Sequence, residues 1–269
     1  MANILEIKKL NFSYGKTTIF KDFNLSVPEG KYISIAGNNT SGKTTLIKLI
    51  SGILPSKNTV TIGYSYVDNN RIQDHTKELG IVFGDNLNTF LFEDVYKEMA
   101  FPLENLNIEP AEIEKRILEL AKSFGVSKLL DKKTVDLTQS EKQEILLVLS
   151  LLHKPRILLL DNPFSMMNRD TKIKIKHALK EYQKNNKLTI VLTTTNLDDT
   201  IDTDYLYIIN DGDILIEGEP LTVLKEDTML NHLGLYNSFM VDLSLKLKFY
   251  ELLDDVELDM DRMVNTLWK

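Results

Sequence analysis

Residues 37–44 read Gly37-Asn38-Asn39-Thr40-Ser41-Gly42-Lys43-Thr44, and the fold expected for the chain follows from this stretch. It matches the pattern G-x-x-x-x-G-K-[ST], in which glycines let the backbone curl so that its N–H groups point at phosphate oxygens. An apolar run at residues 32–36 precedes it, and Leu46, Leu49 and Ile50 follow at helical spacing. This succession of strand, loop and helix is the context that the pattern requires, so we predict a phosphate-binding loop rather than a surface turn that happens to contain glycine.

The chemistry of the loop predicts that it binds ATP and Mg²⁺. The helix that begins near Gly42 would add the positive end of its dipole to the N–H groups of the loop. Lys43 can reach the β- and γ-phosphates, and the Thr44 hydroxyl can bind Mg²⁺. We therefore expect residues 37–45, which end at Thr45, to bind the nucleotide.

A second apolar run supplies the other expected magnesium ligand. Residues 157–160 are Ile-Leu-Leu-Leu and are followed by Asp161, as in a Walker B strand. Asp161 would hold Mg²⁺ through water, beside Thr44. Taken alone, the run would be better explained as a buried strand that ends at a helix-starting aspartate. Its pairing with the phosphate-binding loop favours the magnesium site.

Hydrophobic periodicity predicts an α/β fold around these two motifs. Apolar residues alternate with polar ones near the start of the chain, whereas residues 93–152 show a helical and charged pattern, with Ile113, Ile117, Leu118 and Leu120 expected on one face of a helix. Thr138, followed three residues later by Glu141, predicts a capping box before the apolar run at residues 145–152. Strand patterns return at residues 157–160 and 189–193, with a lysine-rich helix between them. Strands that alternate with helices indicate a parallel sheet covered on both faces, into which the helical middle is inserted.

Composition narrows the classes of function. The 269 residues are 43% hydrophobic and carry a formal net charge of −7, which argues against a nucleic-acid partner. The sequence has no cysteine, so disulfides and thiol chemistry are excluded. Residues 1–7 lack the features of a signal peptide, and the densest apolar run, residues 145–152, is shorter than the ~20 residues that span a bilayer. We therefore expect any membrane role to depend on a partner.

The order of these parts resembles that of ABC transporter ATPases along essentially the whole chain. Tyr14 of Asn11-Phe12-Ser13-Tyr14 stands where that family has the aromatic residue that stacks on adenine; an ordinary strand aromatic is the alternative. The family's signature motif LSGGQ corresponds to Leu137-Thr138-Gln139-Ser140-Glu141, and its D-loop corresponds to Ser165-Met166-Met167-Asn168. The resemblance implies a P-loop NTPase cassette with a RecA-like parallel core, an N-terminal antiparallel β subdomain and an inserted helical subdomain at about residues 90–152.

Two further stretches resemble the ATPases of energy-coupling-factor (ECF) transporters. One is Leu91-Phe92-Glu93-Asp94-Val95 with the residues up to Asn105, and the other is the tail from Val241 to Lys269. Generic packing of amphipathic helices is the alternative for both. The resemblance implies a cassette over residues 1–226 and a helical dimerisation extension over residues 227–269. For this reason we expect a helix near Leu245, where alternation alone would also allow a strand.

The chain departs from the family at three positions that catalysis uses. The glutamate that activates water is replaced by Asn162, whose amide accepts no proton at neutral pH. Thr195 stands in place of the switch histidine, and Gly84 in place of the Q-loop glutamine. Asp85 is a candidate substitute for that glutamine. We therefore expect the chain's own hydrolytic site to be impaired.

The signature is also altered. Gln139 and Ser140 replace two glycines that let the backbone approach the γ-phosphate held by an opposite subunit, and Glu141 adds a negative charge that should repel it. Thr138 keeps a hydroxyl, which would retain some contact. Together with Asn162, these changes suggest that the partner is a different ATPase chain rather than a second copy.

The resemblance thus implies an ATP-binding subunit of an importer for a vitamin or other micronutrient. Its partners would be a second ATPase subunit, a transmembrane coupling subunit and a substrate-binding membrane subunit, and it would lie peripherally on the cytoplasmic face of the membrane. A non-hydrolysing scaffold or regulatory subunit is the second reading. A soluble ABC protein acting on ribosomes or DNA is the third, and the single cassette and acidic charge count against it.

Overall fold

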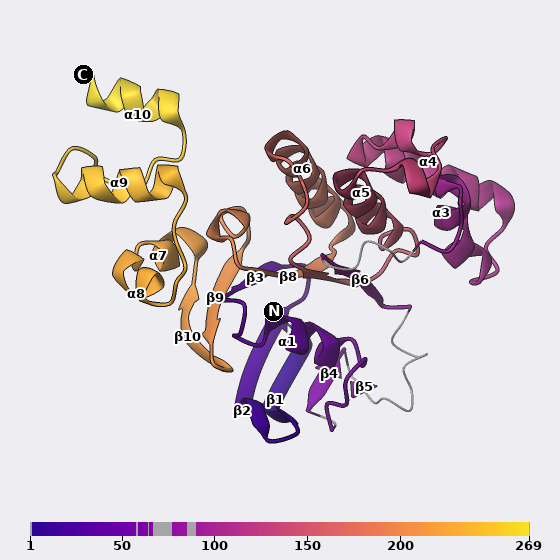
Figure 1. The fold of residues 1–269 in the computed structure, drawn as a ribbon, viewed down its shortest axis with the longest axis horizontal. Coiled ribbons are helices and arrows are strands. Elements are labelled where there is room, and N and C mark those ends of the chain that lie inside the picture. Colours follow the sequence, from indigo (N-terminus) through magenta and orange to yellow (C-terminus); the bar gives the residue numbers. More distant parts are fainter. Residues whose placement is uncertain (1, 58, 64, 67–76, 85–89, 269) are drawn as a thin grey trace.

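The computed structural model describes residues 2–57, 59–63, 65–66, 77–84 and 90–268. Asp85, the candidate substitute in the Q-loop, lies outside the described residues. The chain folds around two sheets, with helices packed between and outside them (Figure 1). Its strands are β1 (Asn3–Tyr14), β2 (Thr17–Pro28), β3 (Tyr32–Ala36), β4 (Val60–Ile62), β5 (Ser65–Tyr66), β6 (Leu79–Phe83), β7 (Ile157–Asp161), β8 (Thr189–Thr194), β9 (Tyr205–Asn210) and β10 (Asp213–Gly218).

The larger sheet has six strands in the order β10-β9-β3-β8-β7-β6. The five strands from β9 to β6 are parallel, and β10 pairs antiparallel with β9. Every residue of β3, β7 and β8 is buried, because helices or the second sheet cover both faces. This arrangement confirms the α/β fold class with a parallel core that the sequence predicts.

The smaller sheet is antiparallel, in the order β2-β1-β4-β5, and forms the N-terminal part of the fold. Helix α1 (Lys43–Ile50) packs between the two sheets, and its Leu46, Ile47, Leu49 and Ile50 belong to one apolar cluster with residues of β1, β2 and β7. The helix is short and buried on most of its surface. Its N-terminus, and the loop before it, are therefore held by both sheets.

The helical middle follows β6 and comprises α3 (Val95–Glu104), α4 (Pro110–Phe124) and α5 (Gln139–Leu149). These helices share an apolar cluster with the face of the large sheet that α1 does not cover. Ile113, Ile117 and Leu120 are buried on one face of α4 as expected. Leu118 was predicted for the same face but is exposed, because five residues from Ile113 bring it to the opposite side of a helix.

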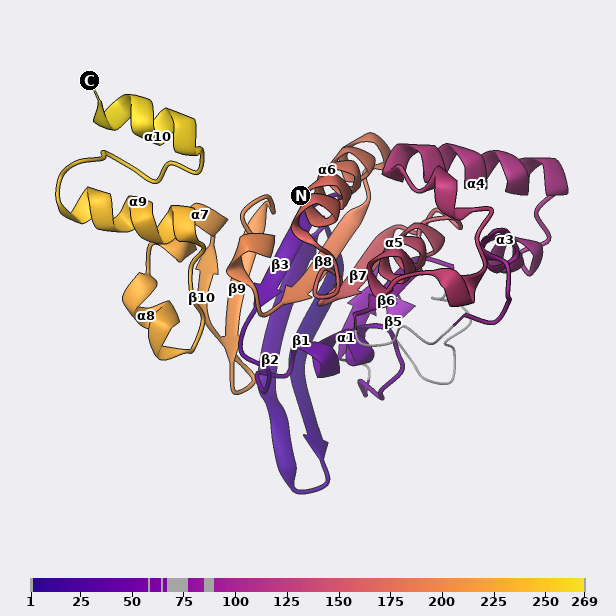
Figure 2. The same cartoon turned by 45° about the horizontal axis from the view of Figure 1, so that its top comes forward.

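After β7, the long helix α6 (Arg169–Asn186) leads back to β8, and four helices follow β10. They are α7 (Pro220–Leu224), α8 (Asp227–His232), α9 (Phe239–Phe249) and α10 (Met260–Leu267). Residues around Leu245 form a helix, as the ECF resemblance predicts, and α10 lies alongside α9 at the end of the molecule (Figure 2). None of the helices in the described part of the chain is long and apolar enough to cross a membrane.

Candidate nucleotide-binding site

The phosphate-binding loop connects the carboxyl end of β3 to α1. Each of its two glycines is required for a different structural reason. A Cβ on Gly37 would lie 2.4 Å from the Ile209 carbonyl oxygen, so no larger residue fits there. Gly42 is the N-cap of α1 and has a φ of 97°, a backbone conformation that residues with a Cβ rarely adopt. The loop is thereby held close to the first turn of α1, where the Ser41 N–H donates to the Asn38 carbonyl.

Lys43 is buried at the start of α1, with its ammonium group inside the loop. Nζ donates to the Gly37 carbonyl at 2.8 Å, to the Asn38 carbonyl at 2.5 Å and to Ser41 Oγ at 3.3 Å. Burial lowers the pKa of Lys43 to about 8, and the charge of Asp161 opposes this shift. The loop thus holds a cation where phosphate oxygens would be bound.

The two residues expected to hold magnesium contact each other. Thr44 Oγ1 donates to Asp161 Oδ2 at 2.7 Å. The other carboxylate oxygen, Oδ1, accepts from Thr193 Oγ1 at 2.6 Å, because Thr193 lies beside Asp161 in the register of β7 and β8. A hydroxyl and a fixed carboxylate are oxygen ligands of the kind that Mg²⁺ takes when phosphates complete its coordination.

A cavity of about 480 Å³ connects these groups. Asn162 and Thr195 line it beside the loop, so the structure brings together the residues expected at the positions of the catalytic base and the switch. The segments that carry them follow β7 and β8, whose carboxyl ends meet next to that of β3. The residues that line the cavity are Ile19, Asn39, Thr40, Gly42, Lys43, Thr44, Thr45, Asp161, Asn162 and Thr195.

Gly84 and Asn162 pack directly against each other through their backbones. The Gly84 N–H donates to the Asp161 carbonyl at 2.7 Å, and a Cβ on Gly84 would lie 2.3 Å from the Asn162 carbonyl oxygen. Asn162 itself has a φ of 49°, in the left-handed region that asparagine tolerates better than most residues. The glycine at the Q-loop position therefore makes room for the backbone at the base position.

Tyr14 is half exposed near the end of β1, where its ring packs edge-on against Phe12 with centroids 4.9 Å apart. It is not among the described residues that line the cavity, whereas Ile19 of β2 is. Ile19 could not be predicted from the sequence, because its place at the cavity depends on the pairing of β2 with β1. The stacking of Tyr14 on adenine stays a prediction.

The signature residues form the N-terminus of α5, away from the cavity of the same chain. Thr138 is the N-cap, and its Oγ1 accepts from the Glu141 N–H while the Glu141 carboxylate accepts from the Thr138 N–H, which confirms the capping box expected from the sequence. Lys132 Nζ also lies 2.7 Å from Glu141 Oε1, and this contact lowers the pKa of the glutamate. Glu141 is thus charged but paired, so its repulsion of a polyanion is weaker than the sequence suggests.

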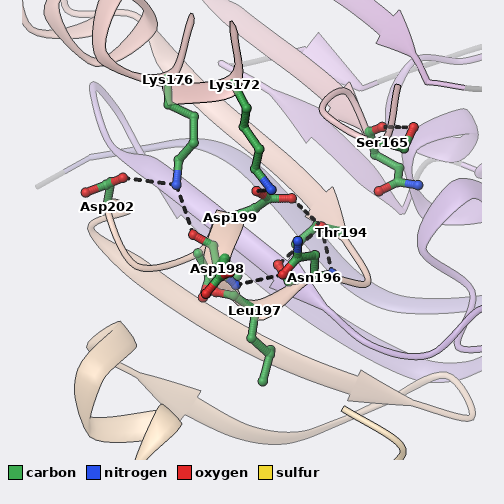
Figure 3. Close-up of polar contacts among 11 residues, drawn as sticks. Ser165, Lys172, Lys176, Thr194, Asn196, Leu197, Asp198, Asp199 and Asp202 are labelled. Carbon is green, nitrogen blue, oxygen red and sulfur yellow. Dashed lines mark hydrogen bonds and ion pairs between the residues drawn. The ribbon is translucent and has the colours of Figure 1, made fainter. Parts of the chain in front are cut away.

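The segment after β8 contacts α6 through a set of polar groups that sequence analysis did not single out (Figure 3). Lys172 and Lys176 of α6 point toward Asp199 and Asp202, and Thr194 bonds to Asp199. The signal was present in the sequence: lysines recur at four-residue spacing in the helix, and aspartates cluster after residue 197.

The fold and the site together define an ATP-binding cassette of the ABC class. The family model described as "ABC transporter" matches residues 20–165, which run from β2 to the D-loop. Within this family, the chain belongs with the ATP-binding proteins of ECF transporters. It is 30% identical to the "Energy-coupling factor transporter ATP-binding protein EcfA1" of Mycoplasma mobile, over 99% of this chain and 97% of the relative. The corresponding EcfA of Pediococcus pentosaceus is 28% identical over 97% of this chain and 95% of its own.

Solved structures agree with this assignment. The chain resembles CbiO1 of Clostridium perfringens, described as part of the ABC transporter complex CbiONQ, with a TM-score of 0.78 and 27% identity over 90% of this chain and 99% of that one. It also shares the fold of MJ0796, a bacterial ABC transporter cassette solved as a dimer, with a TM-score of 0.72 and 22% identity over 80% of this chain and 98% of that one.

Proposed function

We propose that the chain binds MgATP in the cavity around Lys43 and serves as the ATP-binding subunit of an ECF-type importer. The contact between the Thr44 hydroxyl and the Asp161 carboxylate carries this proposal, because it places a magnesium-binding pair at the mouth of the phosphate-binding loop. Membership of the ECF family and the buried lysine in the loop support it. Tyr14 would stack on the adenine.

Each group in the site has a distinct task in this proposal. The loop N–H groups and the dipole of α1 bind the phosphate oxygens, and Lys43 exchanges its bonds with the loop carbonyls for bonds to the β- and γ-phosphates. Thr44 and Asp161 hold the magnesium ion, which neutralises phosphate charge when it is bound. Thr193 keeps the Asp161 carboxylate in its orientation.

The chain's own site would hydrolyse ATP slowly. Asn162 is positioned at the cavity but its amide cannot take a proton from water, and loss of a general base typically costs about 10² to 10⁴ in rate. Thr195 has a shorter reach than histidine and no cationic form. Bound ATP would therefore persist in this site without being hydrolysed. A second ATPase subunit of a different sequence would supply most of the ATP turnover.

Two surfaces would join that second subunit. One is the N-terminus of α5, whose position away from the cavity of the same chain fits a signature that completes a site on another chain. The other is the helical extension at residues 227–269, where large apolar side chains are exposed on α9, α10 and their flanks: Phe239, Phe249, Tyr250, Met260, Val264 and Trp268.

The remaining partners follow from the ECF family. The chain would sit on the cytoplasmic face of the membrane, bound to a transmembrane coupling subunit and a membrane subunit that recognises a vitamin or other micronutrient. The asparagine at the base position also supports a second function, a non-hydrolysing scaffold that uses bound nucleotide to hold a complex together.

A single-turnover incubation of the purified chain with labelled ATP and Mg²⁺ tests the proposal. We expect bound ATP to persist without forming ADP, and Lys43→Ala to abolish binding. The double variant Asn162→Glu/Thr195→His should then raise the rate of ADP formation. Asn162→Gln/Thr195→His is its matched control, because glutamine has the length of glutamate and the same strain at a φ of 49° but no basic carboxylate.

The outcomes separate the readings. Prompt ADP formation by the unmodified chain that Lys43→Ala abolishes would mean that another residue supplies the base. Equal rates for the glutamate and glutamine variants would show that the missing carboxylate is not the defect. To test the scaffold, Lys43→Ala is introduced into the assembled complex: loss of transport with the assembly intact supports the motor, and disassembly supports the scaffold.

A further inference from the structure

Three lysines recur at four-residue spacing along α6 and bind successive parts of the segment after β8. Lys172 pairs with the Asp199 carboxylate. Lys176 Nζ donates to the Asp198 carbonyl at 2.9 Å and lies 3.0 Å from Asp202 Oδ2, and Lys180 Nζ donates to the Asp202 carbonyl at 2.6 Å. The side chains of Lys172 and Lys176 are largely buried, whereas the hydrogen bond of Lys180 is exposed. We therefore expect the first two interactions to be stronger than the third, because electrostatic interactions are stronger away from water.

The ion pair between Lys172 and Asp199 is connected to strand β8 by a hydrogen bond. Asp199 is 3% exposed, and its Oδ2 accepts from Thr194 Oγ1 at 3.1 Å, while Thr194 is 0% exposed at the last position of β8. Thr194 Oγ1 also accepts from the Asn196 N–H at 3.0 Å. Thr195 lies between these two bonded residues in the chain, so the path of its backbone depends on the position of Asp199.

Successive threonines at this strand end have separate partners. Thr193 bonds to Asp161 in the magnesium-binding pair, Thr194 bonds to Asp199, and Thr195 lines the cavity. On the other side, α6 begins directly after Ser165-Met166-Met167-Asn168, and Ser165 Oγ donates to the Asn162 carbonyl at 3.1 Å. Lys172 therefore connects two segments through its pair with Asp199. One segment carries Asn162 and the other carries Thr195, and both residues line the cavity.

We propose that Lys172 is a positioning residue that, through Asp199 and Thr194, holds Thr195 against the terminal phosphate and so lets the site distinguish ATP from ADP. This inference rests on the proposed nucleotide-binding function and adds a determinant of its specificity. By its resemblance to the family, Thr195 stands at the position of the switch histidine, which contacts the γ-phosphate in ABC ATPases. A buried carboxylate that loses its cation is strongly destabilised, so removal of the Lys172 ammonium would drive Asp199 out toward water and release Thr194.

The test measures the dissociation constants of MgATP and MgADP for the purified full-length chain by titration calorimetry. In Lys172→Met we expect the ratio of the ADP constant to the ATP constant to fall at least about tenfold, the effect of losing one hydrogen bond to a charged group. The constant for ADP should change little, because ADP lacks the phosphate that Thr195 would contact. Lys172→Arg should restore most of the ratio.

Two further variants keep the test sharp. Lys180→Met removes an exposed member of the same lysine series, distant from Thr194, and should leave the ratio unchanged. Lys172→Met/Asp199→Leu removes the buried charges together with the acceptor of the Thr194 hydroxyl, and should fold even if the single variant does not, while still showing the reduced ratio.

The inference is overturned if Lys172→Met matches Lys180→Met, or if both dissociation constants rise in parallel, which would indicate a structural role alone. It is also overturned if the unmodified chain binds ATP and ADP equally, although nucleotide binding then stands. An unmodified chain that binds neither nucleotide would instead contradict the proposed function itself.

Discussion

The Lys43 ammonium group lies in the phosphate-binding loop, where burial lowers its pKa to about 8 from the ordinary value of 10.5. Above pH 8 the free site loses this proton, and binding of a polyanion would require its uptake. We predict that the affinity for MgATP falls as the pH rises from about 8 to 10.5, by up to about tenfold per pH unit. Calorimetric titrations of the unmodified chain at several pH values measure this slope, and an affinity that stays constant across this range would contradict the prediction.

The pKa shift of Lys43 also makes the free energy of unfolding depend on pH. Its pKa is lower in the folded chain than in the unfolded chain, so the unfolded state binds more protons between about pH 8 and 10.5. The buried charge of Lys43 therefore lowers the free energy of unfolding by its full amount below pH 8. This destabilisation decreases as the pH rises from about 8 to 10.5. Urea unfolding of the unmodified chain and of Lys43→Met would separate this contribution from the effect on binding.

At the level of residues, the sequence predicted the groups whose spacing along the chain is fixed. The loop from Gly37 to Thr44 and the strand end at Asp161 were placed correctly because one local pattern contains each of them. Ile19 and Thr193 were not found, because they reach the site through strand pairing between distant segments. The pairing of Glu141 with Lys132 was missed because it joins a loop to a helix N-terminus.

The N-terminus of α5 is stabilised by its capping box, which offers a test at the level of one element. Thr138→Ala removes the acceptor for the Glu141 N–H and should lower the free energy of unfolding by about 1 kcal/mol. Chemical denaturation measures the change. Thr228→Ala is a suitable control because Thr228 is exposed on α8, and its substitution should change stability by less than about 0.5 kcal/mol.

Among the elements, the helices and strands were predicted where burial follows a clear period. The continuous apolar runs that the sequence analysis identified became β3, β7 and β8, and the lysine-rich segment became α6. Residues 241–248 show why period alone is insufficient. Leu243, Leu245 and Leu247 alternate as in a strand, yet the segment is the helix α9, in which Val241 and Ser244 are the buried positions.

The helical extension at residues 227–269 is where assembly can be tested on the whole molecule. Val264 and Trp268 are exposed on and just after α10, next to the buried Met263. We predict that Val264→Glu/Trp268→Glu weakens association with a catalytically intact ECF ATPase at least about tenfold, since two charges would enter an apolar contact. Sedimentation of the mixture measures the association.

Nucleotide binding by the same double variant is the internal control for that prediction. The phosphate-binding loop lies at the carboxyl ends of β3, β7 and β8, far from α10 (Figures 1 and 2). The dissociation constant of MgATP should therefore stay within about twofold of the unmodified value. Unchanged association would mean that the extension does not pair the two ATPase subunits.

The backbone contact between Gly84 and Asn162 constrains which side chains residues 84 and 162 can carry. A glutamine introduced at residue 84 alone would bring its Cβ within 2.3 Å of the Asn162 carbonyl oxygen, so the peptide after Asn162 would have to move first. A glutamate introduced at residue 162 alone would inherit a left-handed backbone that suits it less well than asparagine. Each substitution made alone is therefore penalised by the backbone conformation at these two positions.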